Sequence, residues 1–256
     1  DGIGGVATGG AHLLVGLKES KEERSQEMKM KTLSVLAGVS APLIMAAPSD
    51  AGFVGTYVTK KDNAFNLMTV NVYAEFDNPG ADWMQAVAGT PGAPMNLSVV
   101  GGGGFYNNQF GSDQAPGTAL IAVFPSLAYD SFFTIGIKAL ATGSVNALNL
   151  VNMPILAGTS VSTVNGSWGL VPPTAAQGNP FDPANSFPGN GSILIGQFST
   201  EVGVDPYGIV GQFLIQYVSD GAIGQSYVSF ENIVPTPGAL GLLGAAGLIG
   251  RRRRRR

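Results

Sequence analysis

The 256-residue chain contains no cysteine. Disulfide bonds, thiolate nucleophiles and cysteine-based zinc or iron–sulfur sites are therefore excluded. Histidine is almost as scarce, because the only one, His12, stands near the start. Without another histidine, the rest of the chain cannot form a Ser-His-Asp triad or a histidine-based metal site. No phosphate-binding glycine motif is present either, and these absences together favour a protein that is not an enzyme.

Charged residues are also few, at 12% of the chain, and they are unevenly distributed. Residues 52–234 contain only three cations, Lys60, Lys61 and Lys138, against eleven Asp and Glu, so the net charge of this body is −8. The other cations lie before residue 32 or after residue 250. Such an acidic body lacks the basic surface that nucleic-acid binding requires, so nucleic acid is not an expected partner.

The segment from Met28 to Ala51 has the layout of a secretory signal peptide. Two lysines at its start are followed by a mostly apolar run to Ala47 and then by small residues. We expect signal peptidase to cleave after Ala51, with Ala47 as the alternative, and the body to be exported. Residues 1–27 precede this methionine and are interpreted as upstream, untranslated reading frame or a disordered leader. A translated N-terminal extension is the alternative.

The sequence ends in a proline motif, an apolar run and a block of arginines. The motif is Val234, Pro235, Thr236, Pro237 and Gly238, and residues 238–250 are all Gly, Ala, Leu or Ile. As a helix, this run spans about 20 Å, less than the roughly 30 Å of a bilayer core. The block would stop transfer and stay in the cytoplasm, and it comprises Arg251, Arg252, Arg253, Arg254, Arg255 and Arg256. The order predicts a transient inner-membrane anchor behind an exported body.

This three-part ending resembles the PEP-CTERM sorting signal, in the Val-Pro-x-Pro-Gly form of planctomycete-like marine bacteria. Thr236 stands where the name-giving motif has glutamate. The resemblance implies recognition by an exosortase-type membrane enzyme, cleavage near the proline motif, and delivery to the cell surface or the extracellular space.

The body also looks similar to an uncharacterised domain of exported proteins from the same bacteria. The similar segments are VNVYAEFDNP (70–79), GGGFYNNQFGSD (102–113), FPSLAYDSFFTIG (124–136) and ILIGQFSTEVG (193–203). This second resemblance implies export, and it implies no activity.

Alternation of apolar and polar residues predicts that the body is mostly β-strand. The expected strands are residues 53–59, 68–76, 83–88, 95–100, 119–124, 132–140, 193–200, 209–218 and 227–233. One short helix is expected at 144–153. The spacing predicts an all-β, two-sheet sandwich of jelly-roll or immunoglobulin-like type, with Trp83 and Trp168 in its core. The signal helix and the short C-terminal apolar helix would flank it.

Two binding sites are candidates in the body. Asp77, Asn78 and Asp82 offer hard oxygen ligands for calcium, although each also fits turn chemistry. A second site, in a Gly/Asn-rich loop, would stack on sugar rings if its aromatics were exposed, whereas in the alternative they plug the end of the sandwich. These aromatics are Phe105, Tyr106 and Phe110.

A carboxylate pair is the remaining enzymatic candidate. Glu75 and Asp77 share one face of a regular strand and would lie about 7 Å apart, which suits an inverting glycosidase. Asp77 also begins an Asp-Asn-Pro-Gly turn, where aspartate is expected for turn chemistry alone.

The sequence therefore predicts an exported protein of the cell surface or extracellular matrix with a structural or adhesive role and with exopolysaccharide as its neighbour. A carbohydrate-binding module is the alternative function, and a glycoside hydrolase is the third.

Overall fold

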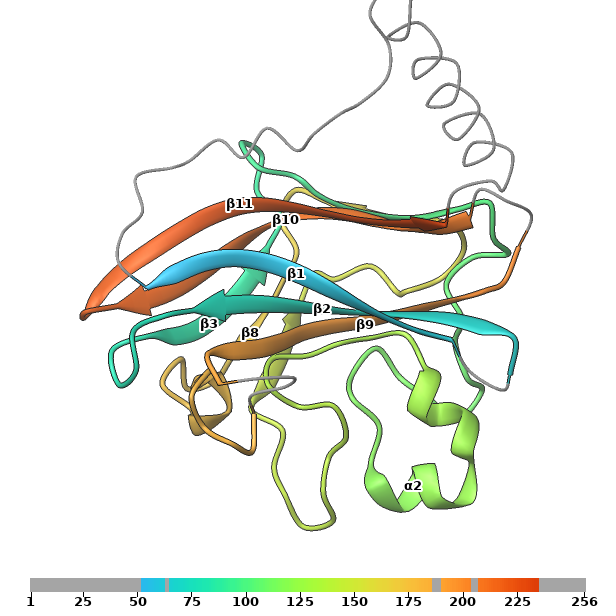
Figure 1. Ribbon diagram of the computed structural model, residues 1–256, viewed down its shortest axis with the longest axis horizontal. Coiled ribbons are helices and arrows are strands. Elements are labelled where there is room, and N and C mark those ends of the chain that lie inside the picture. Colours follow the sequence, from blue (N-terminus) through green and yellow to red (C-terminus); the bar gives the residue numbers. More distant parts are fainter. Residues whose placement is uncertain (1–51, 63–64, 186–189, 204–206, 235–256) are drawn as a thin grey trace, which may run out of the picture. The chain divides into compact units, whose positions relative to one another are not determined.

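A computed structural model describes residues 52–62, 65–185, 190–203 and 207–234 (Figure 1). Three short helical segments accompany the strands in the described residues: helix α2 (Thr118–Val123) and the 3-10 helices η1 (Pro125–Tyr129) and η2 (Ala176–Gly178). The strands are β1 (Phe53–Asp62), β2 (Leu67–Phe76), β3 (Trp83–Ala88), β4 (Met95–Val100), β5 (Phe132–Phe133), β6 (Leu148–Val151), β7 (Ser160–Thr163), β8 (Ser167–Leu170), β9 (Ser192–Glu201), β10 (Tyr207–Ser219) and β11 (Ala222–Val234).

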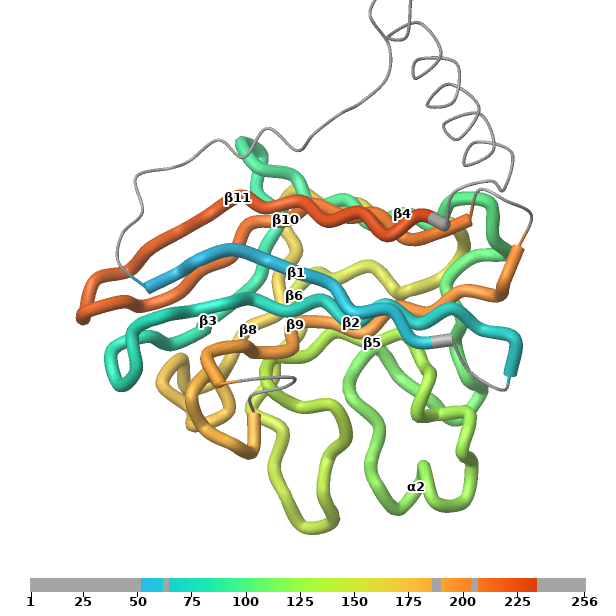
Figure 2. Tube along the Cα trace, viewed as in Figure 1, coloured from blue at the N-terminus to red at the C-terminus, as the bar shows by residue number. Residues whose placement is uncertain are grey.

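The strands form two antiparallel sheets, which confirms the all-β, two-sheet expectation. The first sheet has the order β1-β2-β9-β5. The second has the order β6-β8-β3-β10-β4-β7, and β11 pairs with the other edge of β10. Strand β10 is long enough to pair with β4 along residues 208–212 and with β3 along residues 214–218 (Figure 2).

One hydrophobic core fills the space between the two sheets. In β2 the core residues alternate from Met68 to Phe76, and in β10 they alternate from Ile209 to Tyr217. Aromatic rings of both sheets meet there: Phe198 of β9 lies 6.3 Å from Phe230 of β11 between ring centroids. Two-residue periodicity in the sequence therefore sets which side chains of β2 and β10 point into this core.

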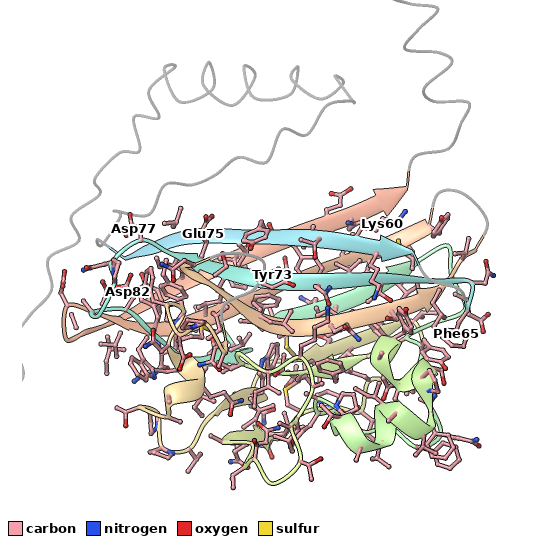
Figure 3. The ribbon with its side chains drawn as sticks, turned by 60° about the horizontal axis from the view of Figure 1, so that its bottom comes forward. Lys60, Phe65, Tyr73, Glu75, Asp77 and Asp82 are labelled. Carbon is pink, nitrogen blue, oxygen red and sulfur yellow. The ribbon has the colours of Figure 1, made fainter. Side chains whose placement is uncertain are left out.

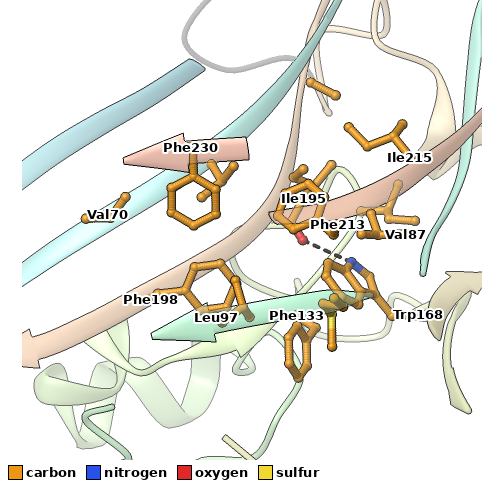
Figure 4. Close-up of a cluster of buried hydrophobic side chains, with 14 of the residues drawn as sticks. Val70, Val87, Leu97, Phe133, Trp168, Ile195, Phe198, Phe213, Ile215 and Phe230 are labelled. Carbon is orange, nitrogen blue, oxygen red and sulfur yellow. Dashed lines mark hydrogen bonds between the residues drawn. The ribbon is translucent and has the colours of Figure 1, made fainter. Parts of the chain in front are cut away.

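Trp168 of β8 joins the two sheets through its indole N–H (Figure 4). Nε1 lies 3.0 Å from the carbonyl oxygen of Ile195 in β9 and 3.1 Å from that of Thr134. Ile195 is the extra residue of a bulge, because Val72 pairs with Gly196 while the adjacent Tyr73 pairs with Leu194. A bulge leaves its extra residue outside the regular pairing, so the Ile195 carbonyl is available to the tryptophan.

The first sheet is covered on its outer face as well. Nine of the ten residues of β2 are buried, Glu75 being the exception. The segment that contains η1 lies against β9, because Gln197 donates from Nε2 to the carbonyl oxygens of Ala128 and Asp130 at 3.1 and 2.8 Å. Ser131 bonds the backbone of Ser199 from the same segment.

Several local expectations are wrong. The apolar run predicted as a strand at 119–124 is helix α2, and the predicted helix at 144–153 contains strand β6 instead. The strand expected at 132–140 is limited to β5, and β7 and β8 had not been predicted. The two flanking helices lie outside the described residues.

Candidate binding face

The outer face of the first sheet carries polar side chains of β1 and β2 and is here called the polar face; two of them, Tyr73 and Glu75, are labelled in Figure 3. The register of β1 with β2 pairs Tyr57 with Tyr73, Thr59 with Asn71, and Lys61 with Thr69. Directly paired residues of antiparallel strands project to the same side, so these six side chains share one face. On β9 the residues paired with Asn71 and Thr69 are the polar Gln197 and Ser199, whereas Tyr73 pairs with the apolar Leu194. Glu75 is the next residue of β2 on the same side as Tyr73.

The two tyrosines form the centre of the polar face. The rings of Tyr57 and Tyr73 are stacked, with centroids 5.1 Å apart and planes 13° from parallel. Burial raises the pKa of both phenols, although side-chain hydrogen bonds, with Ser192 for Tyr57 and Thr59 for Tyr73, act in the opposite direction. The charge of Glu75 raises the pKa of Tyr57 further. Both tyrosines therefore stay neutral at physiological pH and can donate hydrogen bonds from their hydroxyls.

Asn71 lies beside the tyrosines with an unused acceptor. It is 4% exposed, and its Oδ1 has no hydrogen-bond partner among the residues that the structure describes. The neighbouring polar pair is satisfied, because the hydroxyls of Thr69 and Ser199 are 2.8 Å apart and bond to each other. A buried acceptor without a donor is costly, so Asn71 marks a position where an internal water would be stabilising.

One of the three lysines of the body, Lys61, belongs to this face. The Lys61 ammonium lies over the ring of Tyr129, 4.7 Å from its centroid. Burial lowers the pKa of Lys138, and the charge of Lys61 lowers it further. Lys60, in contrast, pairs with Val70 on the opposite side of the strand and lies over Tyr207. Lys61 therefore adds one positive charge to the polar face of an acidic body.

The aromatic loop does not form the platform expected from the sequence. Phe105 is buried and packs edge-on against Phe198, so it belongs to the core and offers no face to a sugar. Tyr106 is half-buried, and its hydroxyl accepts a 3.4 Å hydrogen bond from Asn108. Only Phe110 is exposed, at 47%, and it stacks on Phe124 with centroids 4.0 Å apart.

The three residues predicted to bind calcium are partly brought together. The backbone N–H of Asn78 donates to Oδ2 of Asp82 at 2.9 Å, and its side chain donates to Asp220 at 2.9 Å. Asp82 is 1% exposed and its Oδ1 is without a partner in the described part of the chain, whereas Asp77 is exposed. Within those residues, no group of three or more acidic or histidine side chains converges in a way that could hold a metal ion.

The carboxylates considered for glycosidic chemistry are both exposed. Glu75 stands on the polar face, and Asp77 follows the last residue of β2, where its N–H donates to the Gly52 carbonyl at 2.9 Å. Asp77 therefore continues the pairing of the strand end before the turn begins.

The cleavage and sorting residues lie outside the described residues, except Val234. This residue ends β11 and pairs with Tyr207. In the described parts of the chain, none of the helices has the length and apolar character needed to cross a bilayer.

Sequence reasoning did not identify the polar face. Its residues come from alternate positions of β1 and β2 and from β9, which is more than a hundred residues away. The available signal was the polar residues at every second position from 69 to 75. They indicate that the strand has a second, polar face, but they do not show which segment covers it. Comparisons with protein-family models, curated proteins and solved structures gave no match.

Proposed function

We propose that this chain is an exported protein of the cell surface or extracellular matrix, with a structural or adhesive role next to exopolysaccharide. Signal peptidase would remove the N-terminal segment, and an exosortase-type enzyme would process the C-terminal one. The exported part would be the sandwich, of jelly-roll or immunoglobulin-like type.

The partition of charge carries this proposal. Eleven of the fourteen Lys and Arg residues lie in the two terminal segments, and the body between them is acidic. Cations that flank apolar segments orient a chain in a bilayer, whereas an acidic surface keeps copies of a domain soluble and apart. The same distribution has no evident use in a domain that stays in the cytoplasm.

The position of the last strand supports the proposal further. Val234 is the final paired residue of β11 and also the first residue of the proline motif. Prolines cannot donate to a sheet, so Pro235 and Pro237 favour an end to regular pairing at that point. A processing enzyme would therefore meet its motif directly after the last strand of the described residues.

The experiment is expression of the full chain, with a reporter inserted after Ala51, in a bacterium that contains an exosortase. We expect an external reporter and loss of the arginine block. Replacing Pro235 and Pro237 by alanine should leave that block attached, whereas Pro91→Ala, in an exposed turn of the body, should be processed normally. A cytosolic reporter with an uncut leader would contradict export, and equal processing of all three chains would contradict the motif.

Carbohydrate binding is the second candidate function, and the exposed Phe110 ring stacked on Phe124 favours it. The polar groups of Asn108 and Ser126, joined by a 2.7 Å hydrogen bond, lie in the same part of the chain. Exposed aromatic rings next to hydrogen-bonding groups are suited to sugars. Binding of the full chain to a glycan array tests this function, and the absence of binding to every polysaccharide would remove it.

A further inference from the structure

Asp82 buries a carboxyl group close to the residue that precedes β1. Its side chain is 1% exposed, and it lies with Asp77 at the same end of the sandwich (Figure 3). Oδ2 accepts a 2.9 Å hydrogen bond from the backbone N–H of Asn78, whereas Oδ1 has no hydrogen-bond partner in the described part of the chain. Burying a negative charge without a donor is costly, so this oxygen marks a place for a cationic, hydrogen-bonding group.

Gly52, the residue before β1, lies directly against this oxygen. A Cβ atom added to Gly52 would lie 2.4 Å from Oδ1 of Asp82 and 2.2 Å from Oγ of Ser219, so a larger residue would clash here. The backbone nitrogen of any residue is about 2.5 Å from its own Cβ position, which places the Gly52 nitrogen within about 5 Å of Oδ1. A free amino group at Gly52 can turn toward the carboxyl group by rotation about the Cα–C bond.

Gly52 is held beside Asp82 by contacts that involve only later parts of the chain. It is buried, and its carbonyl oxygen accepts a 2.9 Å hydrogen bond from the N–H of Asp77. The ring of the next residue, Phe53, stacks on Tyr217 with centroids 5.1 Å apart. Removal of everything before Gly52 therefore leaves these contacts in place.

We propose that signal-peptide cleavage after Ala51 gives Gly52 an α-ammonium group that forms a buried ion pair with Asp82. Hydrolysis of the Ala51–Gly52 peptide bond consumes one water, leaves a carboxylate on Ala51 and frees the Gly52 nitrogen, which takes up a proton at neutral pH. One amide N–H thereby becomes three charged N–H donors beside Oδ1. The ion pair then fastens the start of β1 to the segment between β2 and β3.

This inference rests on the proposed export, because it assigns a structural role to the amino group that signal peptidase creates. It also selects between the two expected cleavage positions. A cut after Ala47 would leave residues 48–51 in front of Gly52, and the positive charge would then lie four residues away from it. Only a cut after Ala51 places the charge at Gly52.

The first test identifies the N-terminus of the exported full chain and measures the reactivity of its amino group. N-terminal sequencing and intact mass should give Gly52 as the first residue. Acetylation of this amine at neutral pH, followed by mass spectrometry, should be about tenfold or more slower in the wild type than in Asp82→Asn, because a buried ion pair protects it. Asp77→Asn is the matched control, since Asp77 is an exposed carboxylate at the same end, and it should change the rate by less than about twofold.

The second test asks whether Asp82 stabilises the fold only after cleavage. The uncut chain is the precursor with Ala47→Leu and Ala51→Leu, which remove the small residues that signal peptidase needs. Cut and uncut chains are unfolded by urea in the same mild detergent. We expect Asp82→Asn to lower the folding equilibrium constant of the cut chain about tenfold or more, as loss of one partner of a buried ion pair does. The uncut chain should lose nothing, because asparagine keeps an acceptor for the Asn78 N–H and removes a charge whose partner has not yet been formed.

Three outcomes would overturn this inference and leave export intact. They are a mature chain that begins at Pro48, a Gly52 amine that reacts equally fast in the wild type and in Asp82→Asn, and equal losses of stability in the cut and uncut Asp82→Asn chains. If Asp82→Asn does not fold, the wild-type amine is compared in buffer and in urea, and the inference requires that folding slows its acetylation about tenfold. A leader that stays uncut in the wild type would contradict the proposed function itself.

Discussion

Replacing Trp168 by phenylalanine should destabilise the protein strongly, although it leaves the shape of the core almost unchanged. The indole is fully buried, and its N–H is shared by the carbonyl oxygens of Thr134 and Ile195 at 3.1 and 3.0 Å. Phenylalanine retains a ring that can contact Phe133 but removes the donor. The substitution thus measures the contribution of the hydrogen bonds between the sheets, because most of the packing stays in place.

The magnitude follows from two contributions. Loss of a donor that serves two buried carbonyls costs about 1–3 kcal/mol, and the space left by the missing ring adds about 1 kcal/mol. The Ile195 carbonyl keeps a 3.3 Å bond from the Thr134 N–H, so we expect a total near 3 kcal/mol. For a domain of this size, that lowers Tm by about 6–12 °C.

Trp83→Phe is the matched control, because Trp83 is half-buried and donates to one carbonyl, that of Ala175 at 3.0 Å. We expect it to cost about 1 kcal/mol. Urea unfolding followed by fluorescence suits both variants, since the chain has two tryptophans and each variant retains one. If both substitutions lower the free energy of unfolding equally, the Trp168 N–H contributes no more than the single hydrogen bond of Trp83 and does not join the two sheets.

Two further predictions concern Asp130, which follows η1, and Gly111, which lies in the loop before α2 and packs against Asp130. Burial raises the pKa of Asp130 from its ordinary value of 3.8 to about 6, and the charge of Asp113 contributes less. Between these two pH values the folded protein holds a proton that the unfolded chain has lost. Stability should therefore fall by about 1–3 kcal/mol as pH rises from 4 to 7, and urea titrations should show that Asp130→Asn flattens this slope. Gly111→Ala should cost about 2–3 kcal/mol in the same assay, because its Cβ would lie 1.7 Å from Oδ2 of Asp130, whereas Gly92→Ala, with open space around it, should change stability by less than about 0.5 kcal/mol. An unchanged or steeper slope in Asp130→Asn, or equal costs for the two glycines, would contradict these assignments.

The sequence predicted best the strands whose alternation is long or bounded by clear turns. The expected bounds of β3 and β4 are the observed ones, and the expected β2 differs by one residue. The pairing of β10 with β11 also agrees with a turn at 219–221, where Asp220 has a φ of 50° and Gly221 a φ of 77°. Such turns demand residues that tolerate the left-handed region, so they are visible in sequence.

Short apolar runs were predicted poorly because they are too short to show a helical or a strand period, and because their neighbours in the fold decide their conformation. Residues 119–124 contain alanine, leucine and isoleucine in a stretch too short to show whether its period is two or 3.6. In the structure α2 begins after Gly117 and buries none of its residues, so no sheet competes for them. Strand β6 shows the opposite outcome, because pairing with β8 overrides its local preference.

The polar face illustrates why a site can escape sequence analysis even when its strands are predicted. Whether Lys61 and Asn71 lie near each other depends on the register of β1 with β2. How far their side chains are buried depends on the packing of η1 against β9. The bulge at Ile195 connects this face to the core. Through the extra residue, Leu194 and Gln197 both reach the polar face while the Ile195 carbonyl accepts the Trp168 bond. A one-residue slip in β9 would exchange the two faces beyond it, so the bulge fixes the core contact and the polar array together.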